Sequence, residues 1–185
     1  MKHLLESRNP ATGELLASFE PMDQAAVGTR LERAAVAFRG WRRTSFAERA
    51  RVLDNVADLL EADQAQLARL MTLEMGKLLQ ASGDEILKSA RGCRYYAQHG
   101  ASFLADEEFP TEASRSFVRF EPMGAVFAVM PWIFPFWQVF RFAAPALMAG
   151  NVVLLKHAPN VPQCALAIDT CCARRDCRKT CSRRC

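Results

Sequence analysis

Apolar residues at helical spacing dominate residues 23–105 of the chain. Before them, residues 5–20 are expected to form short extended segments, because Asn9–Glu14 contains the proline and glycine typical of a tight turn. Asp23 is typical of a helix N-cap. Ser45 and Glu48 fit a capping box, in which the two residues satisfy each other's free backbone N–H groups. Four helices are predicted, starting near Asp23, Ser45, Asp63 and Ser82, and the last one is predicted to end near Ala105.

The apolar stripes of these helices are interpreted as core packing. Their members repeat at spacings of three and four, which places them on one face of each helix. The residues expected to face inward are Ala26, Val27, Leu31, Ala34, Ala35 and Phe38, then Val52, Leu53, Val56, Leu59 and Leu60, then Leu67, Leu70, Met71, Met75 and Leu78, and finally Ile86, Leu87, Ala90, Cys93, Tyr96 and Phe103.

The pattern then changes to strands. Residues 116–120 alternate between polar and apolar, which is typical of a half-buried strand. Residues 124–130 and 150–156 are short and almost continuously apolar, as expected of strands buried on both faces. A helix is predicted between them, from Gln138 to Ala149, and another from Val161. Strand, helix and strand in this order indicate a βαβ unit with a parallel sheet, so the predicted fold class is α/β.

Charge is distributed unevenly along the chain. Of 185 residues, 50% are hydrophobic and 24% charged, which is typical of a soluble globular protein of about one domain. The formal net charge is +4, but residues 170–185 carry six basic groups and one acid. The other residues therefore hold 18 basic and 19 acidic groups. Because the body is nearly neutral, no nucleic-acid partner is expected.

The cysteine distribution, the N-terminal residues and the uncharged residues 122–140 together indicate a cytoplasmic protein. Cys93 and Cys164, the two cysteines before residue 170, are interpreted as buried core thiols in a reducing compartment. The N-terminus has no apolar stretch of signal-peptide length. Residues 122–140 lack charge, but Pro131 and Pro135 interrupt them, so no membrane span is expected.

A candidate ligand site follows from the predicted sheet. In α/β proteins, ligands bind outside the carboxyl ends of parallel strands, where residues 130–135 and Lys156 lie. The common nucleotide signature GxGxxG is absent there. The residues alone predict a crevice with an aromatic lip and two cations, formed by Trp132, Phe134, Trp137, Arg141 and Lys156.

Several motifs, in order, resemble the N-terminal part of the NAD(P)-dependent aldehyde dehydrogenase superfamily. They are Asn9-Pro10-Ala11-Thr12-Gly13-Glu14, Leu73-Glu74-Met75-Gly76-Lys77, Glu121-Pro122-Met123-Gly124, Met130-Pro131-Trp132 with Phe134-Pro135, and Pro145-Ala146-Leu147-Met148-Ala149-Gly150-Asn151. Phe136-Trp137-Gln138 and Lys156-His157-Ala158-Pro159-Asn160 look like the succinate-semialdehyde dehydrogenase branch. The resemblance covers residues 8 to about 169.

This resemblance implies a truncated aldehyde dehydrogenase fold. A helical N-terminal segment would pack on the start of a Rossmann-like parallel sheet. Residues 1–113 and 123–169 would form part of the cofactor-binding domain. Residues 114–122 would be the strand of an oligomerisation arm, and the complete protein is expected to be a homo-oligomer.

The resemblance also implies a cofactor site. Met130, Pro131 and Trp132 would line the cofactor cleft through their backbone, and Lys156 would hydrogen-bond the adenosine ribose with the three donors of its ammonium. Many family members carry a glutamate where Pro159 stands, which favours the free ribose hydroxyl of NAD. Without that carboxylate, NADP is expected beside NAD.

The implied substrate is a small aldehyde, succinate semialdehyde, oxidised to succinate. Arg141 would grip its carboxylate through two parallel hydrogen bonds, although a helix-surface arginine or one neutralising a buried acid stays open. Phe134 and Trp137 would line the aldehyde tunnel, or else pack in the core. Ile133 departs from the family, which has an asparagine there to hold the oxyanion; losing one such donor costs about 10²–10³ in rate.

No catalytic residue of the family is expected to be intact in this chain. The glycine-rich nicotinamide loop, the general-base glutamate and the nucleophilic cysteine have no counterpart in the sequence. The chain as written is therefore expected to be an enzyme fragment, and an inactive truncated product or a subunit-interaction remnant are the alternatives.

Residues 170–185 form a Cys/Arg-rich tail that does not continue the family pattern. Cys177, Cys181 and Cys185 would place three thiols on one helix face, but the paired spacing of zinc sites is missing, so no metal is expected. A genuine basic tail is a second interpretation. We favour a third, a frameshift, because GC-rich codons for Val, Leu and Arg read one base later give the cysteine codon TGC.

Overall fold

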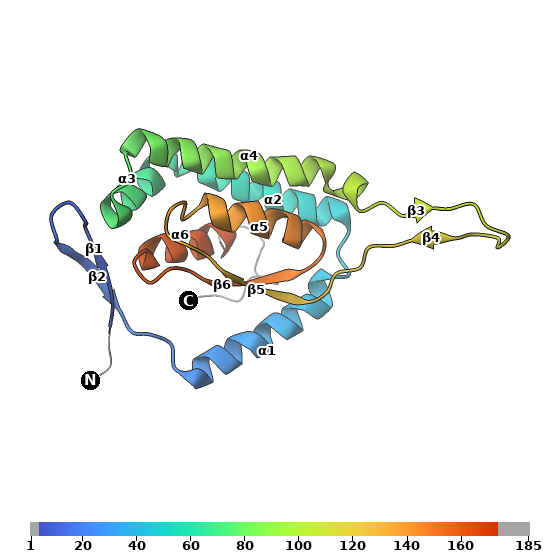
Figure 1. Cartoon of the computed structure of the whole chain (residues 1–185), viewed down its shortest axis with the longest axis horizontal. Helices are drawn as coiled ribbons and strands as arrows, with labels where there is room; N and C mark the ends of the chain where they lie inside the picture. Colours follow the sequence, from blue (N-terminus) through green and yellow to red (C-terminus); the bar gives the residue numbers. More distant parts are fainter. Residues whose placement is uncertain (1–3, 174–185) are drawn as a thin grey trace.

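The computed structural model describes residues 4–173 and begins with a β-hairpin (Figure 1). Strand β1 (Leu5–Arg8) pairs antiparallel with β2 (Leu15–Phe19). The predicted turn between them is confirmed, and Gly13 adopts a left-handed φ of 76° in it. Helix α1 (Gln24–Trp41) begins as predicted at Asp23, whose carboxylate accepts the N–H of Ala26 at 2.8 Å.

Three helices form the upper layer in Figure 1. They are α2 (Phe46–Ala62), α3 (Gln64–Met75) and α4 (Leu79–Phe103), with α2 and α4 packed along each other. The Ser45–Glu48 capping box is formed as predicted. Leu78, expected to face inward, is 78% exposed. Gly76 ends α3 in the left-handed conformation, so Leu78 lies in the link to α4 and outside the helical period of α3.

The second half of the chain forms the predicted βαβ unit. Strand β5 (Ala125–Val129), helix α5 (Trp137–Met148), strand β6 (Val152–Lys156) and helix α6 (Pro162–Ala173) follow in order. The two strands pair in parallel, with Ala125 opposite Val152 and Val129 opposite Lys156. The α/β fold class is therefore confirmed. Helix α6 continues past Asp169, and the remainder of the predicted Cys/Arg-rich tail lies outside the described residues.

The main core lies between this unit and the α2–α4 layer. Cys93 and Cys164 are fully buried in it, as predicted. The opposite side of the strand pair is less covered. Phe127 and Val129, expected to be buried, are 62% and 63% exposed, because α1 is the helix on that side and it covers only part of the sheet (Figure 1).

Helix α1 is itself only partly packed. Ala34 and Trp41, in its C-terminal half, join Val152 in a small second core. Val27 and Leu31, which were expected to be buried, are exposed because the N-terminal half of the helix diverges from the strand pair (Figure 1).

A second hairpin projects from the end of α4 (Figure 1). It joins β3 (Glu107–Glu108) to β4 (Phe117–Val118) in antiparallel pairing. Arg119 forms a bidentate ion pair with Asp106 at 2.6 and 2.9 Å across its base. Phe117 and Val118 are exposed, so the predicted half-buried strand is exposed on both faces, because the hairpin extends away from the body. Phe103, expected to be buried, is also exposed near the start of this projection.

Candidate functional site

The carboxyl edge of the strand pair brings the predicted cofactor residues together. Val129 and Lys156 are register partners, and the N–H of Met130 donates to the carbonyl of Lys156 at 3.0 Å. Pro131 and Trp132 follow at once and are exposed. Lys156 is also exposed and makes no ion pair with any residue between 4 and 173. Its ammonium is therefore available to a ligand at this edge.

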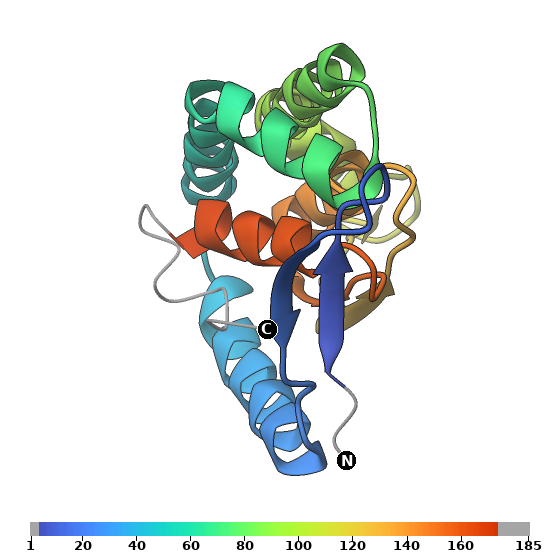
Figure 2. The ribbon, with the colours of Figure 1, turned by 90° about the vertical axis from the view of Figure 1, so that its left-hand side faces the viewer.

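Trp132 borders an open groove of about 630 Å³. The groove runs between the loop after β5, the segment after β6, and the β1–β2 hairpin, which faces the viewer in Figure 2. Its lining residues are Leu4, Leu5, Glu6, Arg8, Pro10, Glu74, Met75, Trp132, Pro159 and Asn160.

A buried ion pair lies beneath the loop after β5. Lys77 pairs with Glu85, and both side chains are largely buried. The Lys77 ammonium lies 3.8 Å from the ring centre of Phe134, a cation–π contact, and donates to the carbonyl of Ile133 at 3.5 Å. Lys77 therefore contacts both Phe134, a predicted substrate residue, and Ile133, which stands where the family has an asparagine.

Charged side chains hold both ends of α5. At its N-terminus, Glu85 accepts the N–H groups of Phe136 at 2.9 Å and Trp137 at 3.0 Å. At its C-terminus, the buried guanidinium of Arg49 donates to the carbonyl of Met148 at 3.1 Å. A carboxylate at the start of a helix and a cation at its end both complement the helix dipole.

Trp137 and Arg141 occupy successive turns of α5. The ring of Trp137 is half-buried, with the Lys88 ammonium 4.4 Å from its centre and Gly92 close by. Arg141 is exposed and makes no ion pair within the described part of the chain. It does not neutralise a buried acid there, so the surface and substrate interpretations of Arg141 stay open.

Glu74 anchors the first turn of α6. Its two oxygens accept the N–H groups of Gln163 and Cys164, each at 2.8 Å, and the hydroxyl of Ser7 at 2.7 Å. This carboxylate joins α3, α6 and β1. It also lies close to Cys164, whose pKa is raised chiefly by burial and secondarily by that negative charge.

Four residues that organise this edge could not be assigned a role from the sequence. Glu74, Lys77, Glu85 and His157 are buried or nearly so, and each bonds a chain segment at least 22 residues distant. One signal in the sequence could have indicated such a residue. A carboxylate normally lies on the solvated face of a helix, but in the segment Met71–Met75 it lies among the apolar positions.

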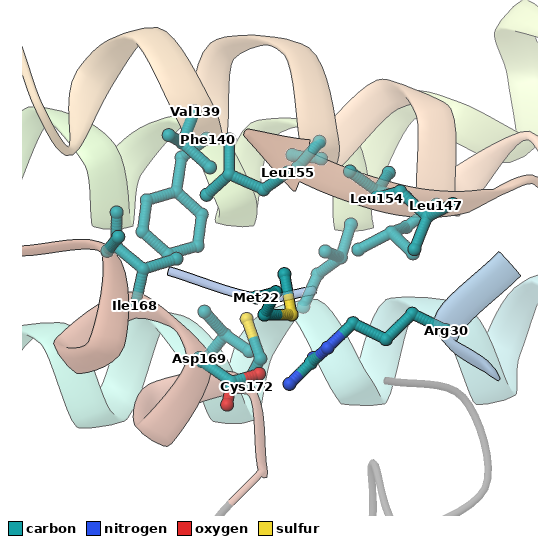
Figure 3. A pocket seen from close by; sticks show the side chains of 16 residues that line it. Met22, Arg30, Val139, Phe140, Leu147, Leu154, Leu155, Ile168, Asp169 and Cys172 are labelled. Atoms are coloured by element: carbon teal, nitrogen blue, oxygen red, sulfur yellow. The ribbon is translucent and has the colours of Figure 1, made fainter. Parts of the chain in front are cut away.

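A separate, partly open cavity of about 110 Å³ lies along β6, away from this edge (Figure 3). It is lined mainly by apolar side chains such as Phe140, Leu155 and Ile168, and Arg30 points toward Asp169 and Cys172 at one side. Within residues 4–173 no three His, Cys, Asp or Glu side chains gather as a metal site would require. No helix of the described residues is long and apolar enough to cross a membrane.

Comparison with known proteins identifies the class. Residues 2–177 match the model of the aldehyde dehydrogenase family, and the chain belongs to that family. It is 52% identical over 181 residues to succinate-semialdehyde dehydrogenase (NADP(+)) of Mycobacterium leprae, covering 93% of this chain and 39% of that protein. It is 53% identical over 160 residues to the probable succinate-semialdehyde dehydrogenase (NADP(+)) of Synechocystis, covering 86% and 35%.

Solved structures agree with this assignment. The crystal structure of succinic semialdehyde dehydrogenase from Streptococcus pyogenes in complex with NADP+ matches with a TM-score of 0.86 and 32% identity, over 90% of this chain and 37% of that one. The succinate-semialdehyde dehydrogenase from Burkholderia pseudomallei matches with a TM-score of 0.87 and 34% identity, over 93% and 36%. The chain thus spans less than two fifths of the length of these relatives.

Proposed function

We propose that this chain is the N-terminal part of an NAD(P)-dependent enzyme that oxidises succinate semialdehyde to succinate. The observation that supports this proposal most directly is the parallel register of Val129 with Lys156. It places the Met130–Trp132 segment beside a lysine that has no ion-pair partner in the described chain. The proposed substrate, and NADP as a cofactor, follow from the names of the similar proteins of Mycobacterium leprae and Synechocystis.

The residues at this edge fit a nicotinamide nucleotide. Lys156 offers three donors to ribose or phosphate oxygens, and the exposed Pro159 brings no carboxylate that would repel a 2′-phosphate. NADP and NAD are therefore both proposed as cofactors, and the bound nucleotide would supply the hydride acceptor. Met130, Pro131 and Trp132 would line its cleft.

Phe134, Trp137 and Arg141 are proposed to face the aldehyde. The guanidinium of Arg141 is exposed and suits a carboxylate bound through two parallel hydrogen bonds. We also propose the domain division given above, a cytoplasmic location, and assembly of the complete protein into a homo-oligomer through residues 114–122. The exposed β3–β4 hairpin supports that assembly, because it presents apolar side chains away from the body.

Nucleotide binding by the purified chain tests the proposal. Titration calorimetry should detect NADP+ binding, and Lys156→Met should raise the Kd by about tenfold or more, since one charge-assisted hydrogen bond is lost. Arg91→Met, which removes an exposed cation on α4, is the matched control and should leave the Kd unchanged. Equal effects of the two substitutions would contradict the assignment of Lys156.

A fragment without catalytic activity is kept as the alternative proposal. Cys93 and Cys164 are fully buried, and burial raises the pKa of both thiols, which is the opposite of an activated nucleophile. We therefore expect the 185-residue chain to form no NADPH from succinate semialdehyde and NADP+. Steady NADPH production, followed by absorbance, would refute this expectation.

A further inference from the structure

The imidazole of His157 joins the two chain segments that form the carboxyl edge. His157 directly follows Lys156 at the end of β6 and is 8% exposed. Its Nε2 lies 2.9 Å from the carbonyl oxygen of Pro135, and its Nδ1 accepts the N–H of Ala158 at 2.8 Å. An acceptor at Nδ1 and a carbonyl at Nε2 are satisfied together by one protonation state, the neutral ring with its proton on Nε2.

Lys156, the last residue of β6, and His157, which follows it, therefore hold both ends of the loop after β5. The carbonyl of Lys156 accepts the N–H of Met130 at 3.0 Å, and the imidazole of His157 donates to the carbonyl of Pro135. Between these bonds lie residues 131–134, which are all exposed. Glu85 fixes the next peptides from the other side, through Phe136 and Trp137.

We propose that His157 is a positioning residue that fixes the geometry of the 131–134 loop relative to Lys156 only while its imidazole is neutral. The consequence for ligands rests on the proposed function, in which the loop and Lys156 contact the nucleotide and the aldehyde. Protonation would turn Nδ1 from an acceptor into a donor facing the N–H of Ala158, and the ring could no longer keep both bonds.

The surroundings of the ring keep it neutral at neutral pH. Burial is the largest influence and lowers the pKa of His157 below its ordinary 6.5, and the neighbouring Lys156 lowers it further. The bond to Pro135 and the charges of Glu74 on α3 and Glu85 on α4 act in the opposite direction. The hydrogen bond between His157 and Pro135 therefore weakens as the pH falls below about 6.5. It is lost once the pH passes the lowered pKa of His157 in the folded protein.

Hydrogen–deuterium exchange of the full chain tests, without any ligand, whether the hydrogen bond between His157 and Pro135 fixes the loop. His157→Leu removes both bonds, and exchange in the 130–138 peptide should accelerate about tenfold while peptides of α2 keep their rates. His157→Gln offers an amide donor to Pro135 and does not titrate, so it should restore the protection. His99→Gln, at an exposed position on α4, is the control. Unchanged exchange in His157→Leu would overturn the proposal.

A pH series decides the case if His157→Leu loosens the whole chain. The ratio of loop exchange in the wild type to that in His157→Gln should rise at the pH where the His157 resonances titrate in NMR spectra. Those spectra should also show the proton on Nε2 at neutral pH. A ratio that stays constant through this titration, or a proton on Nδ1, would overturn the proposal.

Binding of NADP+ separates this inference from the proposed function. The Kd should rise about tenfold in His157→Leu and by less than about twofold in His157→Gln. Failure of the wild type to bind NADP+ would refute nucleotide binding at this edge, whereas the exchange measurements would still decide whether His157 holds the loop. Loop release in His157→Leu with an unchanged Kd would refute the role in positioning.

Discussion

Replacing Glu85 by glutamine tests how far one buried carboxylate fixes the start of α5. Glu85 is 3% exposed, accepts the N–H groups of Phe136 and Trp137, and pairs with Lys77. Glutamine keeps the size and one accepting oxygen. It removes the charge, however, and places an amide donor against the Lys77 ammonium.

Two losses set the expected magnitude. The two hydrogen bonds to Glu85 become neutral, which costs about 1–2 kcal/mol in total, since charge-assisted bonds are roughly twice as strong as neutral ones. Lys77, whose side chain is 13% exposed, loses its partner, which costs about another 1–2 kcal/mol after discounting for its access to solvent. The sum of about 3 kcal/mol corresponds to a fall in Tm of about 9 °C for a chain of this size.

Urea denaturation followed by circular dichroism gives the free energy of unfolding. Glu85→Gln, Lys77→Met and the double variant form a mutant cycle, in which we expect a coupling energy of about 1–2 kcal/mol. Glu61→Gln is the matched control, because Glu61 pairs with Arg94 at the surface and its loss should cost less than about 1 kcal/mol.

Two results would refute this reasoning. If Glu85→Gln is as stable as Glu61→Gln, the carboxylate does not fix α5 through charge. Alternatively, the losses of Glu85→Gln and Lys77→Met add without coupling, in which case their contact contributes nothing to stability.

Three further outcomes are expected. Gly150→Ala should lower the free energy of unfolding by about 2 kcal/mol, because φ is +89° and the new Cβ would lie 2.9 Å from the Arg49 guanidinium. The control Gly28→Ala, which places its Cβ in open space on α1, should raise the free energy of unfolding by about 0.5–1 kcal/mol. Thermal melts in which the Tm shifts equally in both variants would contradict this prediction. Burial raises the pKa of Cys93 to about 12, so at about pH 8 a thiol reagent should leave it unmodified in the native chain, as mass spectrometry of its peptide would show. In the full-length enzyme, Ile133→Asn should raise kcat by about 10², and an unchanged rate would mean that other groups hold the oxyanion.

The features that the sequence predicts well depend on near neighbours. The caps at Asp23 and Ser45 and the turn at Gly13 each involve bonds within about four residues, and all three are formed. The parallel pair also follows from local patterns, since each strand is a short apolar segment and a helix connects them.

Burial and long-range bonds could not be predicted in the same way. Phe127 and Leu31 are apolar, but what covers a residue depends on the packing of other elements. The bond between Glu74 and Gln163 joins residues 89 positions apart, and that between Glu85 and Phe136 spans 51. No spacing rule connects such pairs, so the residues that support the candidate site emerge only in three dimensions. The roles of Lys156 and Arg141 stay predictions.

The two charged contacts at the ends of α5 also bear on the order of folding. Arg49 and Glu85 precede the groups they bind by 99 and 51 residues, so both come earlier along the chain than the helix they anchor. During synthesis the N-terminal part emerges first, and the α2–α4 layer can form before α5 leaves the ribosome. A circular permutant that begins at α5 would lose this advantage, and a smaller fraction of it should fold during synthesis while its native contacts stay the same.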